Sequence, residues 1–118
     1  MILLLPLPNS ANTHWRHGRG ITYLSKQGRE FRERVVNLVK TVHPSHKPFS
    51  KRLDVTIDIH PRDRRKIDID NRIKPLLDAL QHANVFLDDS QIDRLEVNRR
   101  EITTKGDCKV LIKEIDHG

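Results

Sequence analysis

Three aspartates stand at a spacing that would let them act together. Asp68 and Asp70 alternate with Ile67 and Ile69, and Asp89 follows the next apolar segment. In an extended backbone the first two carboxylates would point the same way while the isoleucines face the core. Two like charges held this close repel each other, so they need neighbouring cations or a metal ion. Mg²⁺ prefers such oxygen ligands, and on these three carboxylates it could activate water to attack a phosphodiester.

Cations surround this acidic group along the chain. Lys74 lies four residues after Asp70, one helical turn along, where it could contact a scissile phosphate or form an ion pair with Asp70. A basic run just before Asp68 would hold DNA phosphates over the metal ion. The run comprises Arg62, Arg64, Arg65 and Lys66.

The same acidic residues also allow a purely structural interpretation. Asp70 could cap a helix, and Asp88-Asp89 could form an ordinary turn. Asp68 could pair with Arg65 or Lys66. Spacing alone leaves both interpretations open, and the basic run favours the catalytic one.

Charge distribution supports a polyanionic partner. The 118 residues contain 22 Lys and Arg against 16 Asp and Glu, a net charge of +6 with a pI near 9.8. Residues 1–66 carry a net charge of +9 and residues 67–118 a net charge of −3. The positive charge therefore precedes the acidic group. The excess suggests a polyanionic partner, although many small soluble proteins are basic merely to stay solvated.

Cysteine and histidine argue against a zinc protein. One cysteine, Cys108, cannot form an internal disulfide, and we expect it to be a small buried residue in a strand. His14 with His17, or His43 with His46, lack the further ligands that a structural zinc site needs. We interpret His14 and His17 as part of a DNA-contacting loop or of solvated surface, and Trp15 between them as a DNA, core or dimer contact.

No apolar run is long enough to cross a bilayer or to serve as a secretory signal. We therefore expect a soluble, cytoplasmic, DNA-associated protein with no membrane partner and no organic cofactor.

Periodicity predicts a single domain over residues 1–118. Apolar residues recur at three-and-four spacing in two segments and alternate in the others, while prolines and glycines separate them. Pro75 complicates the second helix: either Asp70 or Asn71 caps a kinked first turn, or the helix begins at Pro75. Residues 6–20 are expected to be a loop. The predicted elements are strands Ile2–Leu5 and Ile21–Leu24, a helix capped by Ser25 and ended by Pro44, strand Leu53–His60, a helix to about Asn84, and strands Ile92–Ile102 and Cys108–Ile115.

This order predicts an α+β fold in which a mixed sheet packs against two main helices on one side. Thr104 to Asp107 is expected to form the turn of a hairpin between the last two strands. Residues 3–7 and those two strands are the candidate dimer interface because they offer apolar or edge-strand surface.

Several motifs together resemble the RusA family of Holliday junction resolvases. They are Asp63-Arg-Arg-Lys66, Asp68-Ile-Asp-Asn71, Lys74, Asp78-Ala-Leu80 and Leu87-Asp-Asp-Ser-Gln91, with Leu5-Pro6, Asn12, Arg16-His17, Gly18-Arg-Gly20 and Ser25 to Gly28 at matching spacing. The likeness spans nearly the whole chain.

The resemblance implies a homodimeric, RusA-like fold that binds four-way junction DNA and resolves it by paired symmetric nicks in recombination and repair, using Mg²⁺ or Mn²⁺. It assigns the metal-binding and catalytic aspartates to Asp68, Asp70 and Asp89, and the catalytic lysine to Lys74. A basic residue important for handling DNA falls on Lys66. The other expected DNA-binding residues are Arg62, Arg64, Arg65, Arg16, Arg19, Asn12 and Asn71. A non-catalytic DNA-binding protein and a metal-dependent ribonuclease remain the alternatives.

Overall fold

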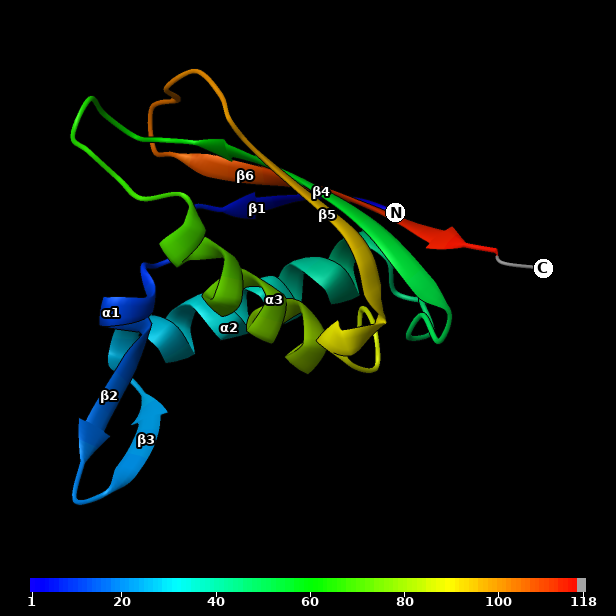
Figure 1. Cartoon of the computed structure of the whole chain (residues 1–118), viewed down its shortest axis with the longest axis horizontal. Coiled ribbons are helices and arrows are strands. Elements are labelled where there is room, and N and C mark those ends of the chain that lie inside the picture. The colour runs from blue at the N-terminus through cyan, green and yellow to red at the C-terminus, as the bar shows by residue number, and fades with distance from the viewer. Residues whose placement is uncertain (117–118) are drawn as a thin grey trace.

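A twisted four-stranded sheet with two long helices across one face forms the body of the protein in the computed structural model (Figure 1), which describes residues 1–116. The α+β prediction is confirmed, and residues 117–118 of the predicted domain lie outside the described part. The elements are β1 (Ile2–Pro6), α1 (Ala11–His14), β2 (Trp15–Gly18), β3 (Ile21–Leu24), α2 (Lys26–Val42), β4 (Arg52–His60), η1 (Asp70–Arg72), α3 (Ile73–His82), η2 (Asp89–Gln91), β5 (Ile92–Arg99) and β6 (Asp107–Ile115).

The sheet has the order β1-β6-β4-β5, with β6 antiparallel to both of its neighbours and β5 parallel to β4. Alternation decides which side chains face the helices. In β4 every second residue from Leu53 to Ile59 is fully buried, and in β1 Leu3 and Leu5 are buried while Leu4 is exposed. One face of the sheet is therefore the core, as the period-two patterns predict.

The predicted hairpin between the last two strands is wrong. β4 lies between β5 and β6, so these two strands are not neighbours. The connection instead passes over the end of β4, where Arg100 N donates to Ile59 O at 2.8 Å and Thr103 N donates to Pro61 O at 3.0 Å. A parallel partner needs a long crossover, and residues 61–91 with α3 provide it between β4 and β5. Local turn residues predicted the bend but could not predict which strand lies beside which.

Helix α2 begins where the sequence predicts. Ser25 is its N-cap, and the Ser25 hydroxyl accepts a hydrogen bond from Gly28 N at 3.0 Å. Phe31, Val35 and Val39 form its buried stripe. Gly28 is required by a close approach, because a Cβ there would overlap the backbone oxygen of His14.

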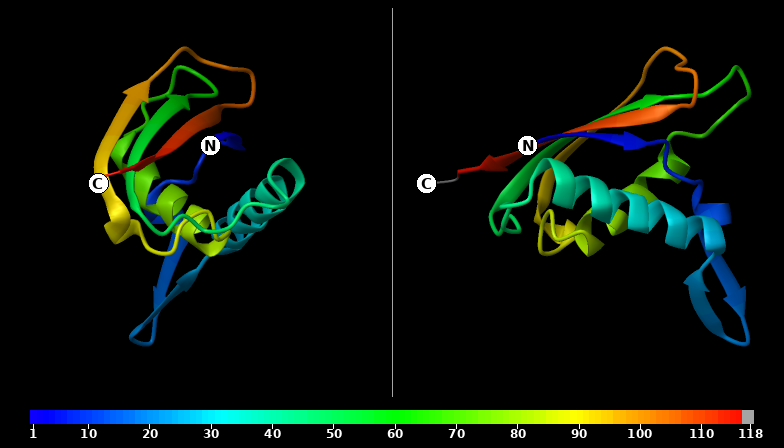
Figure 2. Two further views of the ribbon diagram at one scale, coloured as in Figure 1. Left: turned by 90° about the vertical axis from the view of Figure 1, so that its right-hand side faces the viewer. Right: turned by 180° about the vertical axis from the view of Figure 1, so that it is seen from behind.

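Part of the predicted loop 6–20 is ordered secondary structure. Residues 11–14 form the short helix α1, and β2 pairs with β3 in an antiparallel ribbon that projects from the body in all three views (Figures 1 and 2). Arg19 and Gly20 make the tight turn at its tip, both with positive φ. Strand β2 has only four residues, Trp15–Gly18, which is too short for an alternating pattern in the sequence to distinguish a strand from a loop.

Candidate active site

The aspartate pair lies in the crossover that joins β4 to β5. The expected extended geometry of residues 67–70 is wrong, because Ile69 has helical angles and Asp70 starts the 3₁₀ turn η1. The alternation of environment is nevertheless present: Ile67 and Ile69 pack against the core, whereas Asp68 and Asp70 are exposed. Within residues 1–116 the two carboxylates have no hydrogen bond or ion pair, so Asp68 does not pair with Arg65 or Lys66.

Helix α3 starts at Ile73, directly after η1, and neither predicted start is correct. Pro75 occupies the third helical position, where a backbone N–H would have no partner within the helix, so the proline costs no hydrogen bond. No side chain caps this end, which removes the capping role considered for Asp70 and Asn71.

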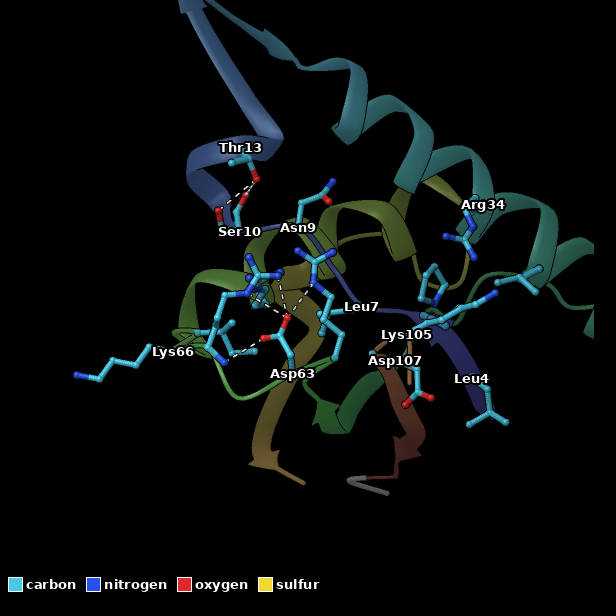
Figure 3. Close-up of a pocket in the computed structure, with 18 residues that line it drawn as sticks. Leu4, Leu7, Asn9, Ser10, Thr13, Arg34, Asp63, Lys66, Lys105 and Asp107 are labelled. Atoms are coloured by element: carbon cyan, nitrogen blue, oxygen red, sulfur yellow. Dashed lines mark hydrogen bonds and ion pairs between the residues drawn. The ribbon is translucent and has the colours of Figure 1, made fainter. Parts of the chain in front are cut away.

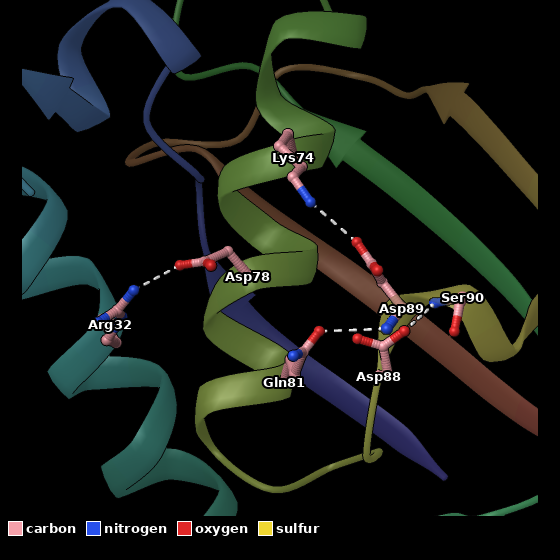
Figure 4. A network of polar contacts seen from close by, with 7 residues as sticks. All are labelled: Arg32, Lys74, Asp78, Gln81, Asp88, Asp89 and Ser90. Carbon is pink, nitrogen blue, oxygen red and sulfur yellow. Dashed lines mark hydrogen bonds and ion pairs between the residues drawn. The ribbon is translucent and has the colours of Figure 1, made fainter. Parts of the chain in front are cut away.

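Lys74 points from the first turn of α3 toward η2 and binds Asp89 rather than Asp70 (Figure 4). The Lys74 Nζ–Asp89 Oδ2 distance is 2.9 Å, with the lysine side chain 64% and the aspartate 32% exposed. This hydrogen bond raises the pKa of Lys74, and the charge of Asp89 adds to it, so the ammonium is positive at neutral pH. The bond connects the first turn of α3, near the middle of the crossover, to η2 at its end.

The turn that presents Asp89 is held by its neighbours. Asp88 caps η2, its carboxylate accepting from Ser90 N at 3.0 Å, and this bond lowers the pKa of Asp88. Gln91 Oε1 accepts from Asp88 N at 2.8 Å. Gln81 Oε1 accepts from Asp89 N at 3.1 Å (Figure 4). The Asp88 carboxylate therefore stabilises the turn, whereas the Asp89 carboxylate does not cap it and binds Lys74. Gln91 belongs to one of the sequence motifs, but the sequence predicted no structural role for either glutamine, although Asp88-x-x-Gln91 has capping-box spacing.

The donor set suits a hard divalent cation, since Asp68 and Asp70 offer unpaired carboxylate oxygens. The arrangement does not enclose one: nowhere in residues 1–116 are three His, Cys, Asp or Glu side chains grouped closely enough to hold a metal ion. Asp89 is instead paired with Lys74.

The predicted DNA-binding residues fall into two groups. Arg16 and Arg19 lie on the projecting ribbon, and Asn12 in α1 lies on an element that packs against η1, which contains Asn71. The second group is the segment after β4, where Asp63 accepts from Arg65 at 2.8 Å and approaches Arg62 at 3.8 Å. The remaining cations of that segment, Arg64 and Lys66, are exposed and without a carboxylate partner among the described residues.

His14 is not part of a DNA-contacting loop. Its ring is fully buried, edge-on to Trp15 at 4.6 Å between ring centroids, and burial lowers its pKa.

An ion pair joins the two main helices: Asp78 in α3 accepts a hydrogen bond from Arg32 in α2 at 2.6 Å (Figure 4). On the sheet, Cys108 is buried as predicted, and burial raises the pKa of its thiol to about 12.

Exposed aspartates, a lysine and a basic segment on a single crossover have the makeup of a metal-dependent nuclease. Comparison with known proteins identifies the class directly: the family model described as "Endodeoxyribonuclease RusA" matches residues 6–113. The chain belongs to the RusA family of endodeoxyribonucleases. No helix in the described part, residues 1–116, is long and apolar enough to cross a membrane.

Named relatives match the chain over almost its full length. The chain is 33% identical to proteins named crossover junction endodeoxyribonuclease RusA from Shigella sonnei and from Enterobacteria phage 82, and 31% identical to the one from Escherichia coli O139:H28. Each match covers 96% of this chain and 93% of the relative. The predicted family is therefore confirmed.

Proposed function

We propose that this RusA-family endodeoxyribonuclease is a Holliday junction resolvase that cuts four-way junctions by paired symmetric nicks, as a Mg²⁺-dependent homodimer in the cytoplasm. Mn²⁺ is expected to substitute for Mg²⁺. The relatives are crossover junction endodeoxyribonucleases by name, which supports the junction substrate. Two strands cut symmetrically require two active sites, which a twofold dimer supplies.

One observation carries the catalytic part of this proposal: the Lys74–Asp89 bond brings the first turn of α3 together with η2, within the crossover that also presents Asp68 and Asp70. The exposed carboxylates of Asp68 and Asp70, with Asp89, would hold the cation. When bound, a divalent cation supplies water activation and stabilises charge on the leaving oxygen.

The protein's own residues then orient and hold the substrate. Lys74 is exposed enough to donate to a non-bridging phosphate oxygen while it also positions Asp89. Arg64 and Lys66, free of carboxylate partners in the described part of the chain, would bind the phosphates next to the one that is cut. Arg16 and Arg19 on the ribbon would contact a second part of the junction.

The test uses a synthetic four-way junction and a linear duplex of the same sequence, each with labelled strands. With Mg²⁺, the wild-type protein should nick opposite strands of the junction and leave the duplex intact. Asp68→Asn, Asp70→Asn and Asp89→Asn should abolish nicking and retain junction binding, since losing a carboxylate relieves repulsion toward DNA. Glu114→Gln is the matched control, because Glu114 is an exposed carboxylate on β6 and outside the crossover.

Two results would contradict the proposal. Salt-sensitive binding with no nicks at any metal concentration would identify a non-catalytic DNA-binding protein, whereas preferential cutting of an RNA competitor would identify a ribonuclease. Nicking by Asp70→Asn at the wild-type rate would remove Asp70 from the proposed ligands.

A further inference from the structure

A groove of about 890 Å³ opens at the β1 edge of the molecule (Figure 3). Its walls come from β1, the segment before α1, α2, the segment after β4 and the turn before β6. Two carboxylates, Asp63 and Asp107, and six cationic side chains line it, so its net charge is +4. The cations are Arg34, Arg62, Arg65, Lys66, Arg72 and Lys105.

Among the described residues, only two of these cations contact a carboxylate, and they share it. Asp63 binds Arg65 and lies 3.8 Å from Arg62, whereas the others have no carboxylate partner among residues 1–116. Three of these others come from elements distant in sequence: Arg34 from α2, Arg72 from η1 and Lys105 from the turn before β6. These three positive charges line one groove without a carboxylate partner among the described residues, and an anion bound between them would reduce their mutual repulsion.

Among the groove cations, Arg72 has a buried guanidinium nitrogen that lacks a hydrogen-bond acceptor in the described part of the chain. Its Nη1 donates to Pro8 O at 2.6 Å, but its Nε is buried and has no hydrogen-bond partner among residues 1–116. Burial lowers the pKa of this guanidinium, and the charge of Arg62 lowers it further. A half-buried guanidinium that has only one carbonyl to donate to remains undercompensated, which a phosphate oxygen would correct.

The shape of the groove is built by close packing. Gly106 has a positive φ of 70°, and a Cβ there would lie 3.0 Å from Leu7 and 3.1 Å from Arg62. The turn that carries Lys105 therefore lies directly against the two opposite walls. Ser10 and Thr13 add hydroxyl groups to the rim, and hydroxyls are frequent phosphate ligands.

The groove is separate from the Lys74–Asp89 site. It lies at the β1 edge, whereas Asp89 leads into β5 at the opposite edge of the sheet. The segment of residues 62–68 runs between them: its first part lines the groove, and it ends at Asp68. A DNA strand bound in the groove would continue along this segment toward Asp68 and Asp70.

We propose that the groove binds the phosphodiester backbone of one arm of the DNA, with Arg34, Arg72 and Lys105 as phosphate ligands in addition to the basic segment. This inference rests on the proposed function. It extends the DNA-binding surface from the crossover to α2 and to the turn before β6.

The test compares two double variants with the same loss of charge. Arg34→Gln with Lys105→Gln empties the groove of two exposed cations, and Lys40→Gln with Lys113→Gln removes two exposed cations elsewhere on α2 and on β6. Binding to an uncut four-way junction is measured without divalent metal at several KCl concentrations. Each lost phosphate contact lowers the slope of log K against log salt by about 0.9. For each subunit whose groove holds DNA, the groove variant should therefore lose about 1.8 from the magnitude of the slope and bind up to about 60-fold more weakly at 0.1 M salt.

Equal slopes for the groove and control variants would overturn the proposal. A change of mass in sedimentation with an unchanged slope would also overturn it, because the groove would then receive a second copy of this chain. Failure of the proposed function is seen separately: the wild-type protein would not nick the junction in Mg²⁺, whereas the slopes are measured without metal.

Discussion

Replacing Lys74 by glutamine should separate cleavage from stability. The Lys74–Asp89 pair is mostly exposed, with side-chain exposures of 64% and 32%, so its loss should lower the free energy of unfolding by less than about 1 kcal/mol. For a domain of this size that corresponds to a shift in Tm of about 4 °C or less. The loss of one donor to the reacting phosphate should instead slow nicking by about 100-fold to 1000-fold.

The assay is single-turnover nicking of a labelled junction in Mg²⁺, with urea denaturation of the same preparations. Lys74→Arg is the control, because it keeps the positive charge and a donor for Asp89; it should be as stable as wild type and recover part of the rate. A rate within threefold of wild type in Lys74→Gln would refute the role of Lys74 at the phosphate. A loss of more than 2 kcal/mol would refute the assignment of the bond as a surface ion pair with little effect on folding.

Four further outcomes follow from the packing and the pKa shifts. Gly28→Ala should lower the free energy of unfolding in urea by about 2 kcal/mol, because its Cβ overlaps the His14 oxygen, and equal stability would contradict that close approach. Asp88 has a lowered pKa, so its contribution to stability is present above pH 3.8 and is lost as the pH falls through its folded value; Asp88→Asn should flatten the acid limb of a Tm-against-pH curve. Lys74 has a raised pKa, so its contribution is complete below pH 10.5 and is lost at higher pH, and Lys74→Gln should remove that part of the alkaline limb. The Cys108 thiol, with a pKa of about 12, should resist a thiol reagent at pH 8 in the native protein and react at once in urea; rapid native labelling would contradict its burial.

Local patterns predicted those parts of the fold that local physics determines. The alternation in Leu53 to Ile59 gave the buried strand, and the serine before the apolar stripe gave the start of α2. The hairpin prediction failed because a turn residue such as Gly106 specifies a bend but not the neighbour of the next strand. Which strand pairs with which depends on the crossover that α3 makes between β4 and β5, a non-local property.

The candidate site divides in the same way. Asp68, Asp70 and Lys74 are close in sequence, so their shared location was predictable, and only the backbone between them differs from the expected strand. The bond from Lys74 to Asp89 was not predicted, because it depends on how the chain returns after α3. The groove cations Arg34, Arg72 and Lys105 come from three elements that meet only in the folded protein, and no spacing in the sequence relates them.

The crossover between β4 and β5 has a consequence for how this enzyme could be altered. All four candidate catalytic residues lie in one uninterrupted connection, bounded on both sides by strands that pair with each other. Changes in the ribbon or in the turn before β6 leave that connection and its two anchoring strands in place. Such a layout allows the DNA contacts on the ribbon, on α2 and on the turn before β6 to vary independently of the residues that cut, whereas the basic segment and Arg72 lie in the same connection as those residues. It makes residues 52–99 the natural segment to exchange between related enzymes in chimeras.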